Sequence, residues 1–302
     1  MEISISTLTP VQVISSTDSQ STATEDELLS PIVSSNFPED TMILSVESTC
    51  WMQNLDDNLR IDKINLPGTH DTGALFGGEW FECQTMTIKE QLHSGIRFLD
   101  IRCRHIENRF AIHHAEVFQN LMFEDVLEDC KSYLKQYSSE FLIIRIKPEH
   151  EEENCNRSFA ETFMATYFDP NLFYTGTDIP TVKEIRGKIY VLQQFPADYK
   201  IGTEWKDINL QDDWDVKDYL EKKKAILHHY TKALQRNSQQ NIFYINFCSG
   251  TGMAGTPLML SRKTNDLVLS FTKGPCGIIV MDYPQNIHIR HIINLNFKKQ
   301  GY

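Results

Sequence analysis

The sequence predicts an α/β fold: a single irregular (βα)8 barrel of the TIM type, preceded by an N-terminal leader. After Cys50, short runs rich in β-branched and aromatic residues alternate with longer amphipathic stretches, which is the order of strands and helices in a parallel barrel. Five of the short runs also end in titratable residues, and barrel enzymes place their functional groups at the carboxyl ends of strands. A length of 302 residues is ordinary for one such barrel.

The leader and the barrel differ in charge. We place the leader at residues 1–45 and the barrel at residues 46–302. Residues 1–59 contain ten acidic residues and no Lys or Arg, whereas the remainder carries 31 acids against 29 bases. The leader is rich in Ser and Thr and buries too little apolar area to offset chain entropy, so we expect it to be flexible. Neither part carries a basic stripe, so the sequence predicts no nucleic-acid partner.

The expected elements follow from hydrophobic periodicity. Eight strand candidates are short and rich in apolar residues, and they cover residues 62–66, 96–102, 110–113, 141–147, 188–193, 205–209, 242–247 and 277–282. Five helix candidates repeat apolar residues at helical spacing, and they cover residues 88–94, 123–137, 158–167, 216–236 and 258–270. The second and third strands are too close in sequence for a helical crossover, so we expect the barrel to be irregular.

The cysteines and the N-terminus bear on the cellular compartment. The seven cysteines are scattered and form no C-x-x-C motif, so we expect mostly free thiols and no structural zinc. No apolar run is long enough to span a bilayer, and no basic segment precedes an apolar core at the N-terminus. We therefore expect a cytoplasmic protein, or one secreted by a non-classical route into a host cell. We also expect a monomer.

Titratable residues close five of the predicted strands. His70 and Asp71 lie in a turn after the first strand, and a histidine there can exchange protons near neutral pH. Arg102 ends the second strand and His114 follows the third. Lys147 and Asp282 end two later strands. Packing of a core does not require this pattern, so we expect these side chains to meet in a site.

These residues carry a resemblance to a known family. Residues 66–73 (LPGTHDTG), 95–102 (GIRFLDIR) and 112–114 (IHH) together resemble the catalytic X region of phosphatidylinositol-specific phospholipases C, and are most similar to the bacterial, metal-independent phosphatidylinositol phosphodiesterases. The resemblance runs in order through about residues 60 to 285, and it includes residues 139–147, 186–192, 244–247 and 280–283.

The resemblance implies a two-histidine mechanism that cleaves phosphatidylinositol to diacylglycerol and inositol 1,2-cyclic phosphate. His70, oriented by Asp282, would be the general base for the inositol 2-hydroxyl. His114, paired with Asp71, would be the general acid for the departing diacylglycerol. Arg102 would hold the phosphate and stabilise its developing charge, a task that suits a planar, permanently charged group.

The same residues bear on metals and on the headgroup. Animal relatives that use calcium carry an Asn at the Asp71 position and an acid at the Arg102 position, so the resemblance implies no metal and no cofactor here. Lys147 and Asp212 match family positions that contact inositol hydroxyls. Two positions depart from the family: Trp214 replaces a tyrosine that stacks on the ring, and Gln194 replaces an arginine.

Several other segments have a structural interpretation beside a functional one. Residues 74–81 include Phe76, Trp80 and Phe81, which either contact the lipid interface or form a lid packed on the barrel. Residues 149–153 are expected to be a solvated charge run, and His113 to be structural. The G-x-G-x-x-G at residues 250–255 is expected to be a rim loop.

Three alternative functions stay open. The first is a catalytically idle barrel that binds an inositide headgroup or serves as an effector scaffold, although a binder would need neither an acid nor a base. The second is a glycerophosphodiesterase, which would require a metal-binding cluster of acids. The third is a nucleotide-dependent oxidoreductase that uses the glycine motif. For the enzyme, the expected partner is phosphatidylinositol in membranes or micelles, reached by transient contact with the membrane surface.

Overall fold

The structure is a computed structural model that describes residues 47–176, 178–237 and 239–298. The predicted leader, residues 1–45, lies outside the described residues, as does the first residue of the predicted barrel. Within the described part of the chain, the helices are too short or too polar to cross a membrane.

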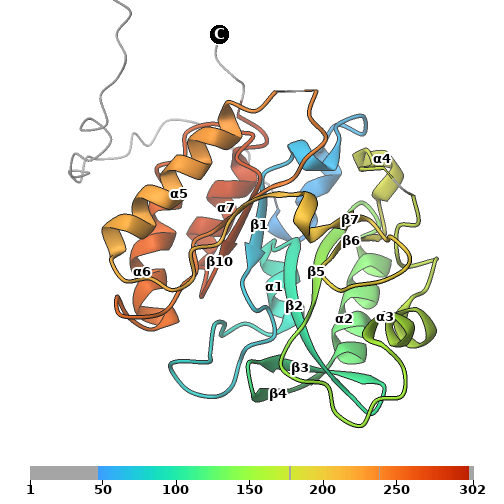
Figure 1. The fold of residues 1–302 in the computed structure, drawn as a ribbon. Helices are drawn as coiled ribbons and strands as arrows, with labels where there is room; N and C mark the ends of the chain where they lie inside the picture. The colour runs from blue at the N-terminus through green and yellow to red at the C-terminus, as the bar shows by residue number, and fades with distance from the viewer. Residues whose placement is uncertain (1–46, 177, 238, 299–302) are drawn as a thin grey trace, which may run out of the picture. The chain divides into compact units, whose positions relative to one another are not determined.

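Eight parallel strands form the frame of the barrel, which confirms the predicted fold class (Figure 1). They run in the order β7-β6-β5-β2-β1-β10-β9-β8, so the first and last strands along the sheet are two of its shortest. Their bounds are β1 Leu66–Thr69, β2 Phe98–Ile106, β5 Leu142–Pro148, β6 Ile189–Gln193, β7 Thr203–Glu204, β8 Asn209–Gln211, β9 Tyr244–Phe247 and β10 Ile278–Met281.

The predicted third strand is not part of the barrel. β3 (Arg109–His114) and β4 (Val117–Met122) are antiparallel, and β3 pairs with the second half of β2 (Figure 1). The β2–β3 turn is formed by Glu107 and Asn108, both with positive φ, which matches the twist of a two-residue hairpin. Because β2 runs on into this hairpin, Arg102 lies in the middle of its strand rather than at the end, and His114 comes back towards the barrel mouth.

Two other strand predictions were also wrong. The predicted strand at 62–66 contains a 3-10 turn at Ile61–Lys63, and β1 begins only at Leu66. β1 includes Pro67-Gly68, a pair that normally marks a turn. Gly68 suits the strand because a Cβ there would lie 2.7 Å from the ring of Phe98. The predicted strand at 205–209 is a 3-10 turn, Trp205–Asp207, between the short strands β7 and β8.

The helices lie outside the strands and agree well with their predicted ranges (Figure 1). α1 matches its prediction at both ends, since Thr87 and Glu90 form a capping box and Gly95 closes the helix in the left-handed conformation. A short α4 and the C-terminal α7 were not predicted. The helix bounds are α1 Ile88–Ser94, α2 Phe123–Gln136, α3 Phe159–Thr162, α4 Val182–Ile185, α5 Tyr219–Leu234, α6 Pro257–Val268 and α7 Asn286–Asn294.

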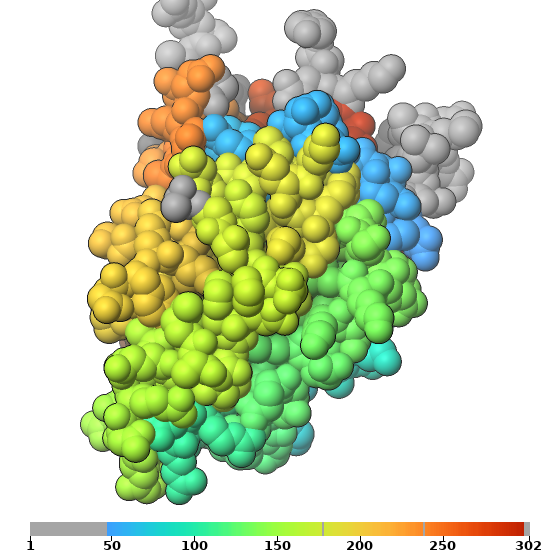
Figure 2. Space-filling model, turned by 90° about the vertical axis from the view of Figure 1, so that its right-hand side faces the viewer, coloured from blue at the N-terminus to red at the C-terminus, as the bar shows by residue number. Residues whose placement is uncertain are grey.

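Two further short helices complete the outer layer. The π-helical turn Phe163–Tyr167 extends α3, so that together they span most of the predicted helix at 158–167. A 3-10 helix, Ser48–Asn54, precedes the first strand. Figure 2 shows the yellow-green chain between β5 and β6 covering one side of the barrel next to α2.

Candidate active site

The turn after β1 is fixed between the two strands on either side of it. The backbone N–H of His70 donates to the carbonyl of Met281 at 3.0 Å, which ties the turn to β10. On the other side, Thr72 N–H donates to the carbonyl of Asp100 at 2.9 Å, and Asp100 N–H donates to the hydroxyl of Thr72 at 2.7 Å. Asp71 between them adopts a left-handed conformation with φ of 38°. A non-glycine residue in that conformation is uncommon and is often found where geometry serves a site.

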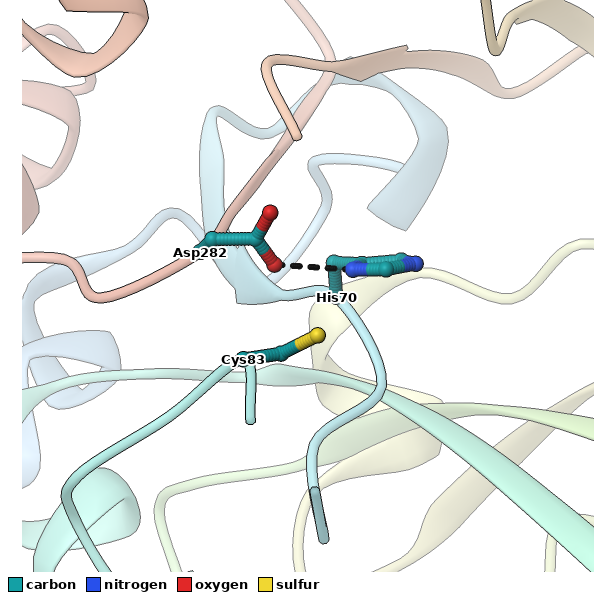
Figure 3. Close-up of side chains that lie close together, drawn as sticks. All are labelled: His70, Cys83 and Asp282. Carbon is teal, nitrogen blue, oxygen red and sulfur yellow. Dashed lines mark hydrogen bonds and ion pairs between the residues drawn. The ribbon is translucent and has the colours of Figure 1, made fainter. Parts of the chain in front are cut away.

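His70 is held at both ring nitrogens. Its Nδ1 lies 2.8 Å from the carboxylate of Asp282, which follows β10 and is 1% exposed (Figure 3). Arg102 donates to its Nε2 at 2.7 Å. Because a guanidinium can only donate, Nε2 carries no proton, and the proton of the neutral ring sits on Nδ1 and points at Asp282. Burial by itself would lower the pKa of His70, but the charge of Asp282 leaves that pKa above its usual value.

Arg102 lies among three carboxylates and the His70 ring. Its guanidinium is 3.2 Å from Asp100, 3.6 Å from Asp71 and 3.8 Å from Glu149. Burial would lower the pKa of Arg102, but these carboxylates raise it above its usual value. The side chain is 11% exposed. It therefore presents a permanent positive charge beside the imidazole, at the mouth of the barrel.

The predicted pairing of Asp71 with His114 is present as an ion-pair contact and not as a hydrogen bond. The two side chains are 3.6 Å apart, while His114 Nδ1 donates its proton to the carbonyl of Phe81 at 2.7 Å. Both carboxylate oxygens of Asp71 are buried and have no hydrogen-bond partner among the described residues. Burial raises the pKa of Asp71, against the opposing effect of Arg102 and His114. The His114 ring meets the His70 ring edge to face, with centroids 6.3 Å apart.

The chain is similar to known proteins of one family. The family model described as phosphatidylinositol-specific phospholipase C, X domain, matches residues 69–195. The 1-phosphatidylinositol phosphodiesterase of Listeria monocytogenes is 31% identical over 284 residues, which cover 83% of this chain and 86% of that protein. The chain belongs to this phospholipase C family. An enzyme of the same name from Staphylococcus aureus is also 31% identical, over 281 residues that cover 80% of this chain and 89% of the relative.

Solved structures of family members have the same fold. A phosphatidylinositol-specific phospholipase C of Staphylococcus aureus aligns with a TM-score of 0.75 at 26% identity, and covers 84% of this chain and 99% of the solved one. That of Listeria monocytogenes aligns with a TM-score of 0.72 at 30% identity, and covers 84% of this chain and 100% of the solved one.

The four expected headgroup residues fall into two groups. Lys147 forms an ion pair of 2.6 Å with Glu149, and the side-chain oxygen of Gln194 accepts a hydrogen bond of 2.6 Å from Arg145. Asp212 and Trp214 follow β8 and line a cavity of about 390 Å³. Within the described chain, the residues that line this cavity do not include His70 or any other of the five expected catalytic residues. The structure therefore brings Lys147 to the histidine site and leaves Asp212 and Trp214 on a neighbouring part of the rim.

Two side chains of the site, Arg145 and Cys83, were not predicted from the sequence. Arg145 on β5 is 4% exposed in its side chain, donates to Asp100 at 3.0 Å, and stacks 4.0 Å from the ring of Trp205. Asp100 thus bridges two guanidiniums, and these hold the pKa of its carboxyl well below the usual range although burial acts to raise it. An Arg inside the apolar run 142–146 was a usable signal, because a charge in a buried strand needs a partner. Cys83 is the second of these side chains, and the sequence around it gives no sign that it belongs to the site.

One other prediction needs correction, and the aromatic residues of 74–81 divide between their two alternatives. Glu149 is not part of a solvated run, since it is 9% exposed and contacts Lys147, Arg102 and the N–H of Ala115. Phe81 is not exposed like its neighbours. It is half-buried and packs on the His114 ring with centroids 5.7 Å apart, whereas Phe76 and Trp80 are 47% and 51% exposed.

Proposed function

We propose that this protein cleaves phosphatidylinositol to diacylglycerol and inositol 1,2-cyclic phosphate by general acid–base catalysis without a metal ion. The observation that carries the proposal is the pair of imidazoles, with ring centroids 6.3 Å apart, and the Arg102 guanidinium beside one of them. Each has its Nδ1 proton committed to a fixed acceptor, Asp282 for His70 and the Phe81 carbonyl for His114. Each therefore directs Nε2 into the site, where one can take a proton and the other, once protonated, can give one.

In this proposal His70 is the base. Arg102 occupies His70 Nε2 in the described structure. A phosphodiester offers that guanidinium two anionic oxygens, which are better acceptors than an imidazole nitrogen. When Arg102 turns to the phosphate, Nε2 is released to take the proton from the inositol 2-hydroxyl as that oxygen attacks phosphorus. Asp282 stabilises the imidazolium that forms, as the carboxylate does in other histidine-based sites.

His114 is the proposed acid, and it protonates the glycerol oxygen as the phosphorus–oxygen bond breaks. The carboxylate of Asp71 lies 3.6 Å from Nδ1 of His114, on the side of the ring opposite the proposed proton transfer at Nε2. Arg102 neutralises charge on the non-bridging oxygens and fills the place of a divalent cation, since a guanidinium cannot itself ligate a metal. Lys147 is proposed to contact inositol hydroxyls at the same mouth, with Gln194 beside it, and Asp212 and Trp214 to contact the headgroup from the neighbouring rim.

The proposed substrate lies in a membrane or micelle, so the protein must meet that surface. Phe76 and Trp80 project from the loop after the catalytic turn, and aromatic rings are favoured at the lipid interface. We propose that this loop makes the transient contact. The test measures how tightly the Phe76→Ala and Trp80→Ala variants bind phosphatidylinositol vesicles. Vesicle binding should weaken in both variants, while their activity on a monomeric short-chain substrate should stay at the wild-type level. Unchanged vesicle binding would refute the assignment.

The activity itself is tested by product analysis in excess chelator, with phosphatidylinositol and phosphatidylcholine side by side and phosphorus NMR as the readout. The proposal expects an inositol cyclic phosphate from the first lipid and no product from the second. Binding of phosphatidylinositol without turnover would favour the idle headgroup binder instead. Turnover that requires added calcium would contradict the role given to Arg102.

A further inference from the structure

A buried thiol lies against the two residues that form the proposed base. Cys83 is fully buried, and Figure 3 shows its sulfur pointing toward the space between His70 and Asp282. One ligand atom from each of the three residues, nitrogen, sulfur and oxygen, lies within 4.8 Å of the other two. These are the three kinds of ligand that Zn²⁺ takes in proteins, and three protein ligands with one open position is the usual form of an accessible zinc site.

The backbone fixes Cys83 in this place. Its N–H donates to the carbonyl of Ala74 at 2.9 Å, and its carbonyl accepts the N–H of Tyr283 at 2.9 Å. The next side chain, Gln84, donates to the carbonyls of His70 at 2.7 Å and Met281 at 3.1 Å. The segment that carries the thiol is thereby tied to those that carry the imidazole and the carboxylate. Little chain entropy would be lost on gathering these ligands around an ion.

Two of the three ligands have unused binding capacity. Asp282 Oδ1 receives the His70 proton, but Oδ2 is buried and accepts no hydrogen bond from the part of the chain that the structure describes. A buried carboxylate oxygen in that state is unfavourable, and a cation would satisfy it. The Cys83 sulfur makes long contacts of 3.9 Å to His114 Nδ1 and the carbonyl of Phe81, and it also lies beside the carboxylate of Asp282. Both atoms could turn to a metal ion without the loss of a strong bond.

We propose that His70, Cys83 and Asp282 form a binding site for one thiophilic divalent cation of the Zn²⁺ type, and that the bound ion inhibits the enzyme. The inhibition rests on the proposed function, whereas the binding does not. Ca²⁺ and Mg²⁺ do not suit this ligand set, because they take oxygen ligands.

The ion would inhibit by changing the protons of the site. As the zinc–sulfur bond forms, the thiol proton leaves to solvent. As Nδ1 of His70 binds the ion, its proton moves to Nε2, so the imidazole stays neutral and loses its hydrogen bond to Asp282. Nε2 then has no lone pair for the inositol hydroxyl, and its new proton faces Arg102, which has to withdraw. One ion thus disables both the base and the phosphate contact.

Binding is tested with Co²⁺ added to the metal-free, full-length protein, because a cobalt–thiolate bond gives a charge-transfer band in the near ultraviolet. We expect this band at a stoichiometry of one ion per chain, and its loss in Cys83→Ser. Cys130→Ser serves as a matched control that keeps the band, since Cys130 is an equally buried thiol on α2. Cys83→Ala is the second variant if the serine disturbs packing. No band in the wild type, or a band that survives both Cys83 substitutions, would overturn the site.

Inhibition is tested with Zn²⁺ on the cleavage of phosphatidylinositol, with each variant compared to its own activity in chelator. Even residues that only support a ligand are worth about 10- to 100-fold in metal affinity, so Cys83→Ser should raise the half-inhibitory Zn²⁺ concentration by about tenfold or more. Chelator should restore the wild type fully. A cobalt band together with undiminished turnover in Zn²⁺ would overturn the inhibition. Absence of turnover in chelator would overturn the proposed function alone, because the cobalt band does not depend on it.

Discussion

A buried arginine–carboxylate network lies at each end of the barrel, and the two networks differ in how completely their hydrogen bonds are made. At the amino end, Arg97 donates twice to Glu140 and also to the carbonyls of Leu92, Ile96 and Thr49. The second oxygen of Glu140 accepts from Met52 N–H. At the carboxyl end, both oxygens of Asp71 and one of Asp282 are buried, and within residues 47–298 as described they have no hydrogen-bond partner.

This difference indicates that the amino-end network stabilises the fold and that the carboxyl-end network serves the proposed site. A fully paired buried network holds the first strands and the N-terminal 3-10 helix in place and has nothing left to offer a ligand. A network with unpaired buried oxygens is unfavourable in the resting protein and is expected where a ligand or a proton completes it. Damage to the first network should therefore lower stability, and damage to the second should lower activity.

The largest effect is expected for the loss of the base. His70→Ala should lower kcat on phosphatidylinositol by about 10²- to 10⁴-fold, the usual contribution of a general base. The midpoint of unfolding in urea should change little, since His70 lies at the mouth of the barrel. Steady-state kinetics and urea denaturation of the same preparation measure both. Wild-type turnover in this variant would remove His70 from the mechanism.

The next effect is on stability and comes from the amino-end network. Arg97→Met leaves Glu140 buried and unpaired, which should lower the free energy of unfolding by about 3–5 kcal/mol. Turnover per folded molecule should stay at the wild-type level. Arg109→Met is the matched control, because its ion pair with Glu124 is exposed and should contribute less than about 1 kcal/mol. Equal losses in the two variants would contradict the role assigned to burial.

The carboxyl-end arginine should show the opposite pattern. Arg102→Met removes the charge proposed to stabilise the phosphate, so kcat should fall by about 10²- to 10³-fold. Its effect on unfolding should be smaller than that of Arg97→Met, since Asp100 keeps its ion pair with Arg145. A variant that is as unstable as Arg97→Met would mean that Arg102 serves the fold.

The sequence predicted which residues belong to the site better than it predicted how the strands pair and which side chains contact one another. The long amphipathic helices and buried strands were found because their patterns are local, as with the capping box and closing glycine of α1. β1 was misplaced because Pro67-Gly68 has the local signature of a turn, and only pairing with β10 and the close approach of Phe98 make it a strand.

The same limit applies to the site. His70, Asp71, Arg102 and His114 stand in short, recognisable strings. Arg145 enters the site because it lies opposite Asp100 in the register of β5 on β2, and Cys83 enters through a loop. The spacing of residues in the sequence predicts neither the register of two strands nor the course of a loop. The hydrogen bond of His114 to the carbonyl of Phe81 depends on that same loop and was equally hidden.

The pH dependence is a smaller effect. The base must be unprotonated, and the pKa of His70 is raised because the charge of Asp282 outweighs burial. Activity should therefore fall as the pH drops below this raised value. Asp282→Asn removes the charge, so the acidic limb of the kcat/KM profile should move to lower pH while the maximum falls. A limb that moves to higher pH, or not at all, would contradict the pairing of His70 with Asp282.

The two histidines are proposed to have different roles, His70 as the base and His114 as the acid. The dependence of each variant's activity on the leaving group tests this most directly. A general acid matters when the departing oxygen is a poor leaving group and matters little when it leaves as a stabilised phenolate. We predict that His114→Ala loses most of its activity on phosphatidylinositol but stays near wild type on an inositol phosphodiester with a nitrophenyl leaving group. His70→Ala should be inactive on both. Equal losses for His114→Ala on the two substrates would contradict the assignment of His114 as the acid.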